Sequence, residues 1–82
     1  MARAEAQWED PNGTARVELA MLEDISRNGA GVRLRQPIRV GSKLSIKWHK
    51  EQLSGTVRHC QREGLEYVLG IQRDTPASEN FS

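Results

Sequence analysis

Apolar and polar side chains alternate with a period of two along most of this 82-residue chain. Over residues 2–9 the alternation is uninterrupted, with Ala2, Ala4, Ala6 and Trp8 on one face and charged or amide side chains on the other. Because neighbouring side chains of an extended strand point to opposite faces, this period is typical of a half-buried β-strand. The pattern recurs and predicts strands over residues 2–9, 14–23, 29–35, 43–49, 53–61 and 65–73.

Turn-forming residues separate the predicted strands. Asp10-Pro11-Asn12-Gly13 combines proline with Asn-Gly, and the loop over residues 36–42 contains Pro37 and Gly41. Proline and glycine favour turns because they fix φ or permit positive φ. The remaining turns are predicted at two short polar segments, residues 50–52 and 62–64. Six short strands separated by turns, with no helical period of comparable length, predict an all-β fold, a small antiparallel barrel or sandwich.

The alternation also predicts which side chains share a face. In the second strand Val17, Leu19 and Met21 lie on one side, and Leu22 and Ile25 break the pattern, which indicates a bulge or bend near Glu23. The sets that share a face in the last three strands are Leu44, Ile46 and Trp48; Leu53, Gly55, Val57 and His59; and Leu65, Tyr67, Leu69 and Ile71.

Composition excludes several classes of function. Twelve basic and eleven acidic residues give a net charge of +1, without the basic excess of nucleic-acid binders, so no nucleic acid is expected as a partner. The chain has no apolar run of about 18 residues that could span a membrane, and no membrane partner is expected. A single cysteine, Cys60, favours a reducing, cytoplasmic setting. His49 and His59 have no partners at zinc-binding spacing, and no catalytic set is present, so neither an enzyme nor a resident cofactor is expected.

The polar segment between the second and third strands carries the most distinctive chemistry. Asp24 and Ser26 can hydrogen-bond backbone groups two residues on, as turn-opening residues do, and Asn28 and Gly29 tolerate positive φ. A carboxylate, a hydroxyl, free N–H groups and several arginines therefore lie near one bend. From spacing alone two interpretations stay open: a hairpin corner with a solvated outer face, or a site for an anion or nucleotide.

The motif favours the second interpretation. Residues 24–29 read D-x-S-x-x-G, and the segments Gly55-Thr56-Val57-Arg58 and Tyr67-Val68-Leu69-Gly70-Ile71 follow in order. Over roughly residues 15–72 the chain resembles the PilZ domains, bacterial modules that bind cyclic di-GMP. The resemblance implies a six-stranded antiparallel PilZ-like β-barrel over residues 1–74 and a polar tail over residues 75–82, with the family's C-terminal helix short or absent. It also implies that Asp24 accepts from guanine N–H groups, that Ser26 adds a hydroxyl contact, and that Gly29 allows close backbone approach.

The other half of the family's ligand site is an R-x-x-x-R pair ahead of the first strand, and these 82 residues do not contain it. Arg3 is the only arginine before Arg16, and Gln7 stands four residues after it. Arg3 and Arg27 are therefore the candidate cationic residues, with Arg33 and Arg35 as further substitutes. Either the pair lies upstream in a longer parent protein or the domain lacks it. The 82 residues alone are expected to bind cyclic di-GMP weakly or not at all.

Three functions are compatible with these residues. The first is a cyclic di-GMP module that relays binding to a partner protein or fused domain by conformational change. The second is a degenerate PilZ domain that acts only through protein–protein contact. The third is a small barrel that stacks single-stranded nucleic acid on Trp8, Trp48 and Tyr67, against which core packing of the two tryptophans is the simpler interpretation.

Overall fold

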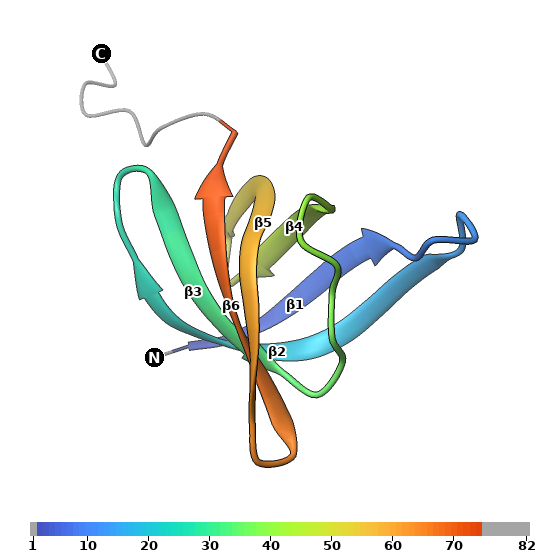
Figure 1. Cartoon of the computed structure of the whole chain (residues 1–82). Helices are drawn as coiled ribbons and strands as arrows, with labels where there is room; N and C mark the ends of the chain where they lie inside the picture. The colour runs from blue at the N-terminus through green and yellow to red at the C-terminus, as the bar shows by residue number, and fades with distance from the viewer. Residues whose placement is uncertain (1, 75–82) are drawn as a thin grey trace.

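The computed structural model describes residues 2–74, which form six strands and no helix. All neighbouring strands are antiparallel and close into a barrel in the order β1-β2-β3-β6-β5-β4 (Figure 1). The six-stranded antiparallel barrel is thus confirmed. The strands are β1 (Ala2–Glu9), β2 (Ala15–Ile25), β3 (Gly29–Leu34), β4 (Lys43–Trp48), β5 (Glu51–Glu63) and β6 (Glu66–Arg73).

The barrel interior is filled by alternate apolar residues from every strand, with Ile38 of the β3–β4 loop added. No buried residue of residues 2–74 is polar or charged, so the interior is stabilised by apolar burial alone. The tightly enclosed residues include Val32, Ile46 and Leu69 from three different strands. The complete set is Ala4, Ala6, Trp8, Ala20, Leu22, Val32, Leu34, Ile38, Leu44, Ile46, Leu53, Val57, Leu69 and Ile71.

A bulge in β2 lies where the sequence places it. The register with β3 shifts between Leu22 and Asp24, so Glu23 is the extra residue. The face that Val17, Leu19 and Met21 share is the outer one: Val17 is 55% and Leu19 71% exposed, whereas Ala20 and Leu22 are buried. Pairing with β1 sets this face, and β2 carries apolar residues on both faces, so its alternation alone does not decide which one is buried.

A second bulge, in β5, was not predicted. The register with β6 shifts between Val57 and His59, which turns His59 outward and lets Cys60 pack against the core. The prediction that His59 shares the face of Val57 is therefore wrong, because an inserted residue reverses the alternation beyond it.

The predicted polar links around β5 are also shorter than expected. β5 takes up most of both links, and the turns contract to His49–Lys50 and Gly64–Leu65. Leu65 lies in its turn and is 80% exposed, so it does not share the inward face of β6 as predicted.

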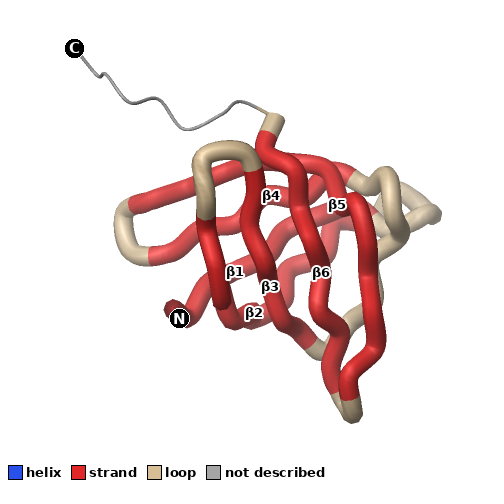
Figure 2. Tube along the Cα trace, turned by 60° about the vertical axis from the view of Figure 1, so that its left-hand side comes forward, coloured by secondary structure: helices blue, strands red, loops and turns tan. Residues whose placement is uncertain are grey.

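The tube view shows β3 running between β2 and β6, which brings the β2–β3 corner beside the C-terminal end of β6 (Figure 2). Within residues 2–74 no helix is long and apolar enough to cross a membrane. The predicted polar tail over residues 75–82, and with it the question of a C-terminal helix, lies outside the described residues.

Candidate functional site

The D-x-S-x-x-G corner joins β2 to β3, and Ser26 closes it. The backbone N–H of Ser26 donates to the carbonyl oxygen of Gly29 at 2.8 Å. The backbone N–H of Gly29 donates to Ser26 Oγ at 3.2 Å, and Ser26 Oγ donates to the Gly29 carbonyl at 3.3 Å. A serine hydroxyl offers one donor and two acceptor positions, so this side chain already holds the turn and keeps one acceptor position for a ligand.

Position 29 requires glycine because there is no room for a β-carbon, and not because of its φ angle. Neither Asn28 nor Gly29 has positive φ, so the corner does not use their tolerance of it. Instead, a β-carbon at position 29 would lie 2.7 Å from the carbonyl oxygen of Ile71 on β6. Gly29 therefore allows a close approach between β3 and β6, and its close approach to a ligand stays a prediction.

Arg73, at the end of β6, holds the corner through hydrogen bonds. The sequence analysis did not identify it as a site residue. Its backbone N–H donates to the Asn28 carbonyl at 2.8 Å, and its guanidinium Nη1 donates to the Ser26 carbonyl at 3.4 Å. Its Nε is buried and makes no hydrogen bond to residues 2–74. Sequence spacing carries no signal for this contact, since 47 residues separate Arg73 from Ser26.

Asp24 faces a groove next to this corner. Asp24 follows the bulge, pairs with Gly31 across the ladder, and is exposed. Its carboxylate accepts no hydrogen bond from residues 2–74, so both oxygens remain available to a ligand. The groove has a volume of about 500 Å³ and is lined by Asp24, Ser26, Asn28, Gly29, Ala30, Gly31, Arg58, His59, Val68, Leu69, Gly70, Ile71 and Gln72.

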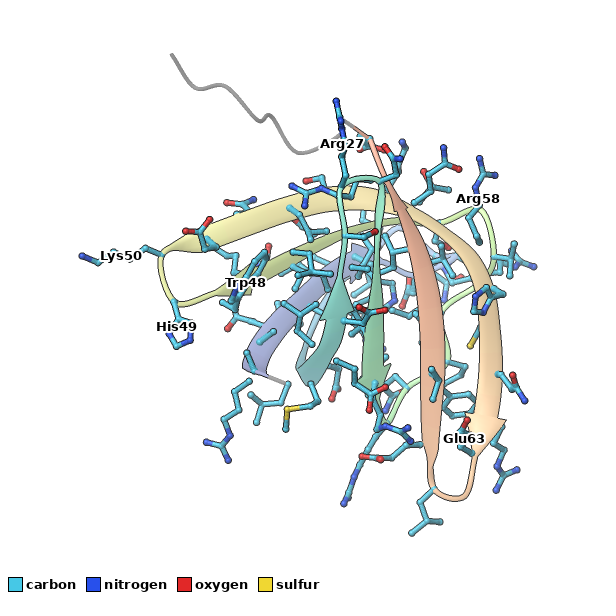
Figure 3. All side chains as sticks on the ribbon, turned by 90° about the vertical axis from the view of Figure 1, so that its left-hand side faces the viewer. Arg27, Trp48, His49, Lys50, Arg58 and Glu63 are labelled. Carbon is cyan, nitrogen blue, oxygen red and sulfur yellow. The ribbon has the colours of Figure 1, made fainter. Side chains whose placement is uncertain are left out.

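The candidate cations do not line this groove. Arg27 lies at the tip of the corner, exposed, and points away from the barrel (Figure 3). Arg3 lies on the outer face of β1 opposite Met21 and lines a different groove of about 510 Å³, together with Leu19 and Arg35. Of the five predicted site residues, the structure therefore brings Asp24, Ser26 and Gly29 together and leaves Arg3 and Arg27 apart from them.

Arg33, a possible substitute, is already occupied. Its Nε lies 2.8 Å from Glu23 Oε2, its Nη2 lies 3.2 Å from Glu63 Oε1, and its Nη1 lies 3.7 Å from Glu66 Oε1. The hydrogen bond that Arg33 donates to Glu23, followed by the one that it donates to Glu63, raises the pKa of Arg33 above its ordinary value despite some desolvation. Three carboxylates around one guanidinium leave a net negative cluster, which repels a phosphate.

Arg58 was missed as a groove residue because the sequence gives no sign of the β5 bulge. Both Arg58 and His59 lie exposed at this bulge, and Arg58 is the arginine in the lining of the groove. Its Nε donates to Gln72 Oε1 at 2.6 Å. Figure 3 shows Arg58 on the outer side of β5.

Trp8, Trp48 and Tyr67 do not form an exposed stacking platform. Trp8 belongs to the buried core, and Trp48 and Tyr67 pack against it from the barrel wall. A larger cavity of about 880 Å³ lies near the β1–β2 turn, lined in part by Trp8, Lys43 and Asp74. Lys43 Nζ and Asp74 Oδ1 are 2.8 Å apart and satisfy each other's charge there. Residues 2–74 contain no group of three potential metal ligands.

Comparison with known proteins agrees with this geometry. The family model for the PilZ domain matches residues 2–80. No curated protein matches the sequence significantly. The family match covers almost the entire chain and includes every strand of the barrel. The chain therefore belongs to the PilZ domain family, which is known for regulatory modules that bind cyclic di-GMP and not for enzymes.

Proposed function

We propose that this chain is a PilZ regulatory module of the bacterial cytosol that supplies one half of a cyclic di-GMP site and, as these 82 residues, binds the dinucleotide weakly or not at all. The observation that carries the proposal is the separation of Arg3 from the Asp24 groove. Acceptors for guanine are present at the corner, but the pair of guanidinium groups that the family places opposite them is absent from this sequence.

The energy of the missing contacts is large relative to the total binding free energy of a micromolar complex. A cyclic dinucleotide presents two phosphates, and an arginine fork binds a phosphate or a guanine edge through two parallel hydrogen bonds. Hydrogen bonds to charged groups contribute about 1.5–3 kcal/mol each. Micromolar affinity corresponds to about 8 kcal/mol in total. Loss of two arginine forks therefore removes most of the binding energy.

The barrel nevertheless has a place for the missing half. Ala2 pairs with Leu22, and β2 continues past the bulge toward the corner. A segment attached ahead of Ala2 and continuing this register would pass beside Asp24. The same geometry provides a relay, because a ligand held between such a segment and the corner would order the segment and change its contacts with a partner.

The test compares two proteins by isothermal titration calorimetry with cyclic di-GMP. The 82-residue chain is expected to bind with a Kd weaker than about 100 μM. This limit corresponds to a binding free energy of about 5.5 kcal/mol, which the chain should not reach without the two arginine forks. A second protein carries an Arg-x-x-x-Arg segment fused ahead of Ala2 and is expected to bind at least tenfold more tightly. Adding Asp24→Ala to the extended protein should remove this gain. A low-micromolar Kd for the 82-residue chain would refute the proposal.

A second candidate function, docking of a protein partner, is favoured by the outer face of β2. Val17 and Leu19 are exposed there, and Arg3 and Arg35 flank Leu19 without ion pairs to residues 2–74. An apolar strip bordered by unpaired cations suits a partner segment with apolar and acidic side chains. A photo-cross-linker at position 19 should give one discrete adduct in bacterial cells. Position 65, which is 80% exposed on a turn, is the matched control and should give none.

A further inference from the structure

The outer face of β2 carries three apolar side chains in a row, here called the β2 strip. Val17, Leu19 and Met21 occupy alternate positions, and none of them belongs to the core cluster. Alternate positions on a strand are about 6.8 Å apart, so the strip is about 14 Å long. Outward positions of an antiparallel sheet are usually polar, since water covers that face. Three consecutive apolar positions therefore indicate a surface that another molecule covers.

The uncompensated charges beside the β2 strip lie at its Met21 end. Arg3 of β1 and Arg33 of β3 stand opposite Met21 on either side. Arg35 follows directly after β3. Arg33 is surrounded by three glutamates, whereas Arg3 and Arg35 form no ion pair or side-chain hydrogen bond with residues 2–74. The Met21 end therefore offers two free guanidinium groups.

The other end of the strip has no such excess of charge. Gln7 stands opposite Val17. Glu5 stands opposite Leu19 and has Lys47 of β4 on its other side. The strip thus has a direction, with a neutral end at Val17 and a cationic end at Met21.

A groove of about 510 Å³ opens at the cationic end, and its lining includes Leu19, Met21, Arg3 and Arg35. Two carboxylates also line it. Glu66 is paired with Arg33, and Glu18 neighbours Leu19 in sequence, so its side chain starts on the opposite face of β2. The groove has room for a large apolar side chain with a carboxylate next to it.

The molecule that fills this groove must satisfy its own backbone hydrogen bonds. Ala20 and Met21 are paired with β1 on one side and with β3 on the other, so β2 offers no free backbone groups there to an added strand. A helix satisfies its own backbone, and its residues four apart lie about 6 Å apart along the axis. This spacing is close to the step of about 6.8 Å between side chains of the strip.

We propose that the β2 strip docks an acidic amphipathic helix of a partner protein. Apolar side chains four residues apart on that helix pack on the strip, and acidic side chains over Met21 pair with Arg3 and Arg35. The assignment rests on the second candidate function above and specifies the partner. The groove beside Asp24 shares no lining residue with this one, so docking does not require cyclic di-GMP.

The experiment titrates the ¹⁵N-labelled 82-residue chain with a helical peptide and follows the amide shifts by NMR. The peptide has about 16 residues, with leucines four residues apart and glutamates in its first two turns. Saturable shifts are expected at Val17, Leu19 and Met21, with a Kd of about 0.1–1 mM, because the contact is smaller than a standard interface. A peptide with lysines in place of the glutamates should bind at least about tenfold more weakly.

Three variants assign the binding to the strip. Leu19→Ser should weaken binding of the glutamate peptide at least about tenfold, and it should leave the fold intact because Leu19 is 71% exposed. Arg35→Glu should weaken binding of the glutamate peptide at least about fivefold and strengthen binding of the lysine peptide. Leu65→Ser, at an apolar residue that is 80% exposed on a turn, is the matched control and should leave the Kd unchanged.

The outcomes separate this inference from the proposed function. Absence of saturable shifts up to about twice the upper expected Kd, shifts centred away from the β2 strip, or equal affinity for the two peptides would overturn the helix assignment. Shifts at the strip that depend on the concentration of the chain alone would assign it to a second copy, and Leu19-dependent binding to phosphatidylglycerol vesicles without peptide binding would assign it to a membrane. All of these leave the cyclic di-GMP proposal standing, because calorimetry tests it separately. A discrete adduct from the cross-linker at position 19 without peptide binding would keep protein docking and reject the helix.

Discussion

Replacement of Gly55 by alanine tests how the barrel is packed, because the obstacle to a side chain there is backbone. Gly55 is buried on the inner face of β5. A β-carbon at this position would overlap the carbonyl oxygen of Gln72 and also meet Ile71 Cγ2 on β6. Neither group can move without disturbing the β5–β6 ladder, in which Gly55 pairs with Arg73 and Thr56 with Gln72.

The expected magnitude follows from this overlap. Overpacking of a core costs about 1–3 kcal/mol, and occasionally more. Because the obstacle is main chain, Gly55→Ala should fall at the upper end, about 3 kcal/mol. In a domain of this size 1 kcal/mol corresponds to about 4–8 °C in Tm, so the expected loss is about 12–24 °C. Gly31→Ala makes the same chemical change where a β-carbon has room, and it should stabilise the protein by about 0.4–1 kcal/mol through the unfolded chain.

Urea unfolding followed by tryptophan fluorescence gives both values, since Trp8 is in the core. Thermal melts by circular dichroism provide the independent Tm. Gly31→Ala is the matched control, because neither glycine has positive φ and the two substitutions differ only in the space available. Equal stabilities for the two variants, or a Gly55→Ala protein as stable as the parent, would refute the reasoning.

Three further outcomes are expected. Gly70→Ala should lower the free energy of unfolding by about 1 kcal/mol, because the new methyl group displaces the His59 ring. In a double-mutant cycle this loss should vanish when His59 is also replaced by alanine. An unchanged loss would mean that the ring is not the obstacle. Arg33→Ala should lower the free energy of unfolding at pH 7, because it removes the cation that lies between Glu23, Glu63 and Glu66, and an Arg33→Ala protein as stable as the parent in urea unfolding would contradict this. The raised pKa of Arg33 means that its contribution to stability is fully present at neutral pH and is lost only as the pH rises through that pKa. Leu22→Ala should lower the free energy of unfolding measured in urea by about 2–4 kcal/mol, whereas Leu19→Ala should change it by no more than about 0.5 kcal/mol. The reverse order would contradict the burial of Leu22 and the exposure of Leu19.

Much of the barrel could be predicted from alternation, and the errors have physical causes. β1 was predicted over the same residues that the structure gives, because alanines and Trp8 alternate with charged groups without interruption. The shared face of Val17, Leu19 and Met21 in β2 follows from alternation, but both faces of β2 are apolar, so only pairing with β1 and β3 decides which one is buried. His59 was misplaced because a bulge of one residue leaves no mark in the composition of β5.

The residues of the candidate site also fall into those that the sequence could identify and those that it could not. Asp24, Ser26 and Gly29 are contiguous in sequence, so a local motif identifies them. Gly31, Gly70, His59 and Arg58 meet at the groove only through the pairing of β2, β3, β6 and β5, which local spacing does not encode. The face of β1 that Arg3 occupies follows from alternation, but its place opposite Met21, outside the groove at the corner, depends on the pairing of β1 with β2.

The two apolar faces of β2 have a consequence for how the chain folds. A slip of one residue against β1 would bury Val17, Leu19 and Met21 in place of Ala20 and Leu22, and hydrophobic burial alone would not reject the shifted hairpin. The register is instead set by the turn between the two strands, where the Asp10 N–H donates to the Thr14 carbonyl and the Gly13 N–H donates to the Asp10 carbonyl, and by the pairing of β2 with β3. A variant in which this turn is replaced by a flexible linker would therefore depend on β3 alone to reject the shifted hairpin.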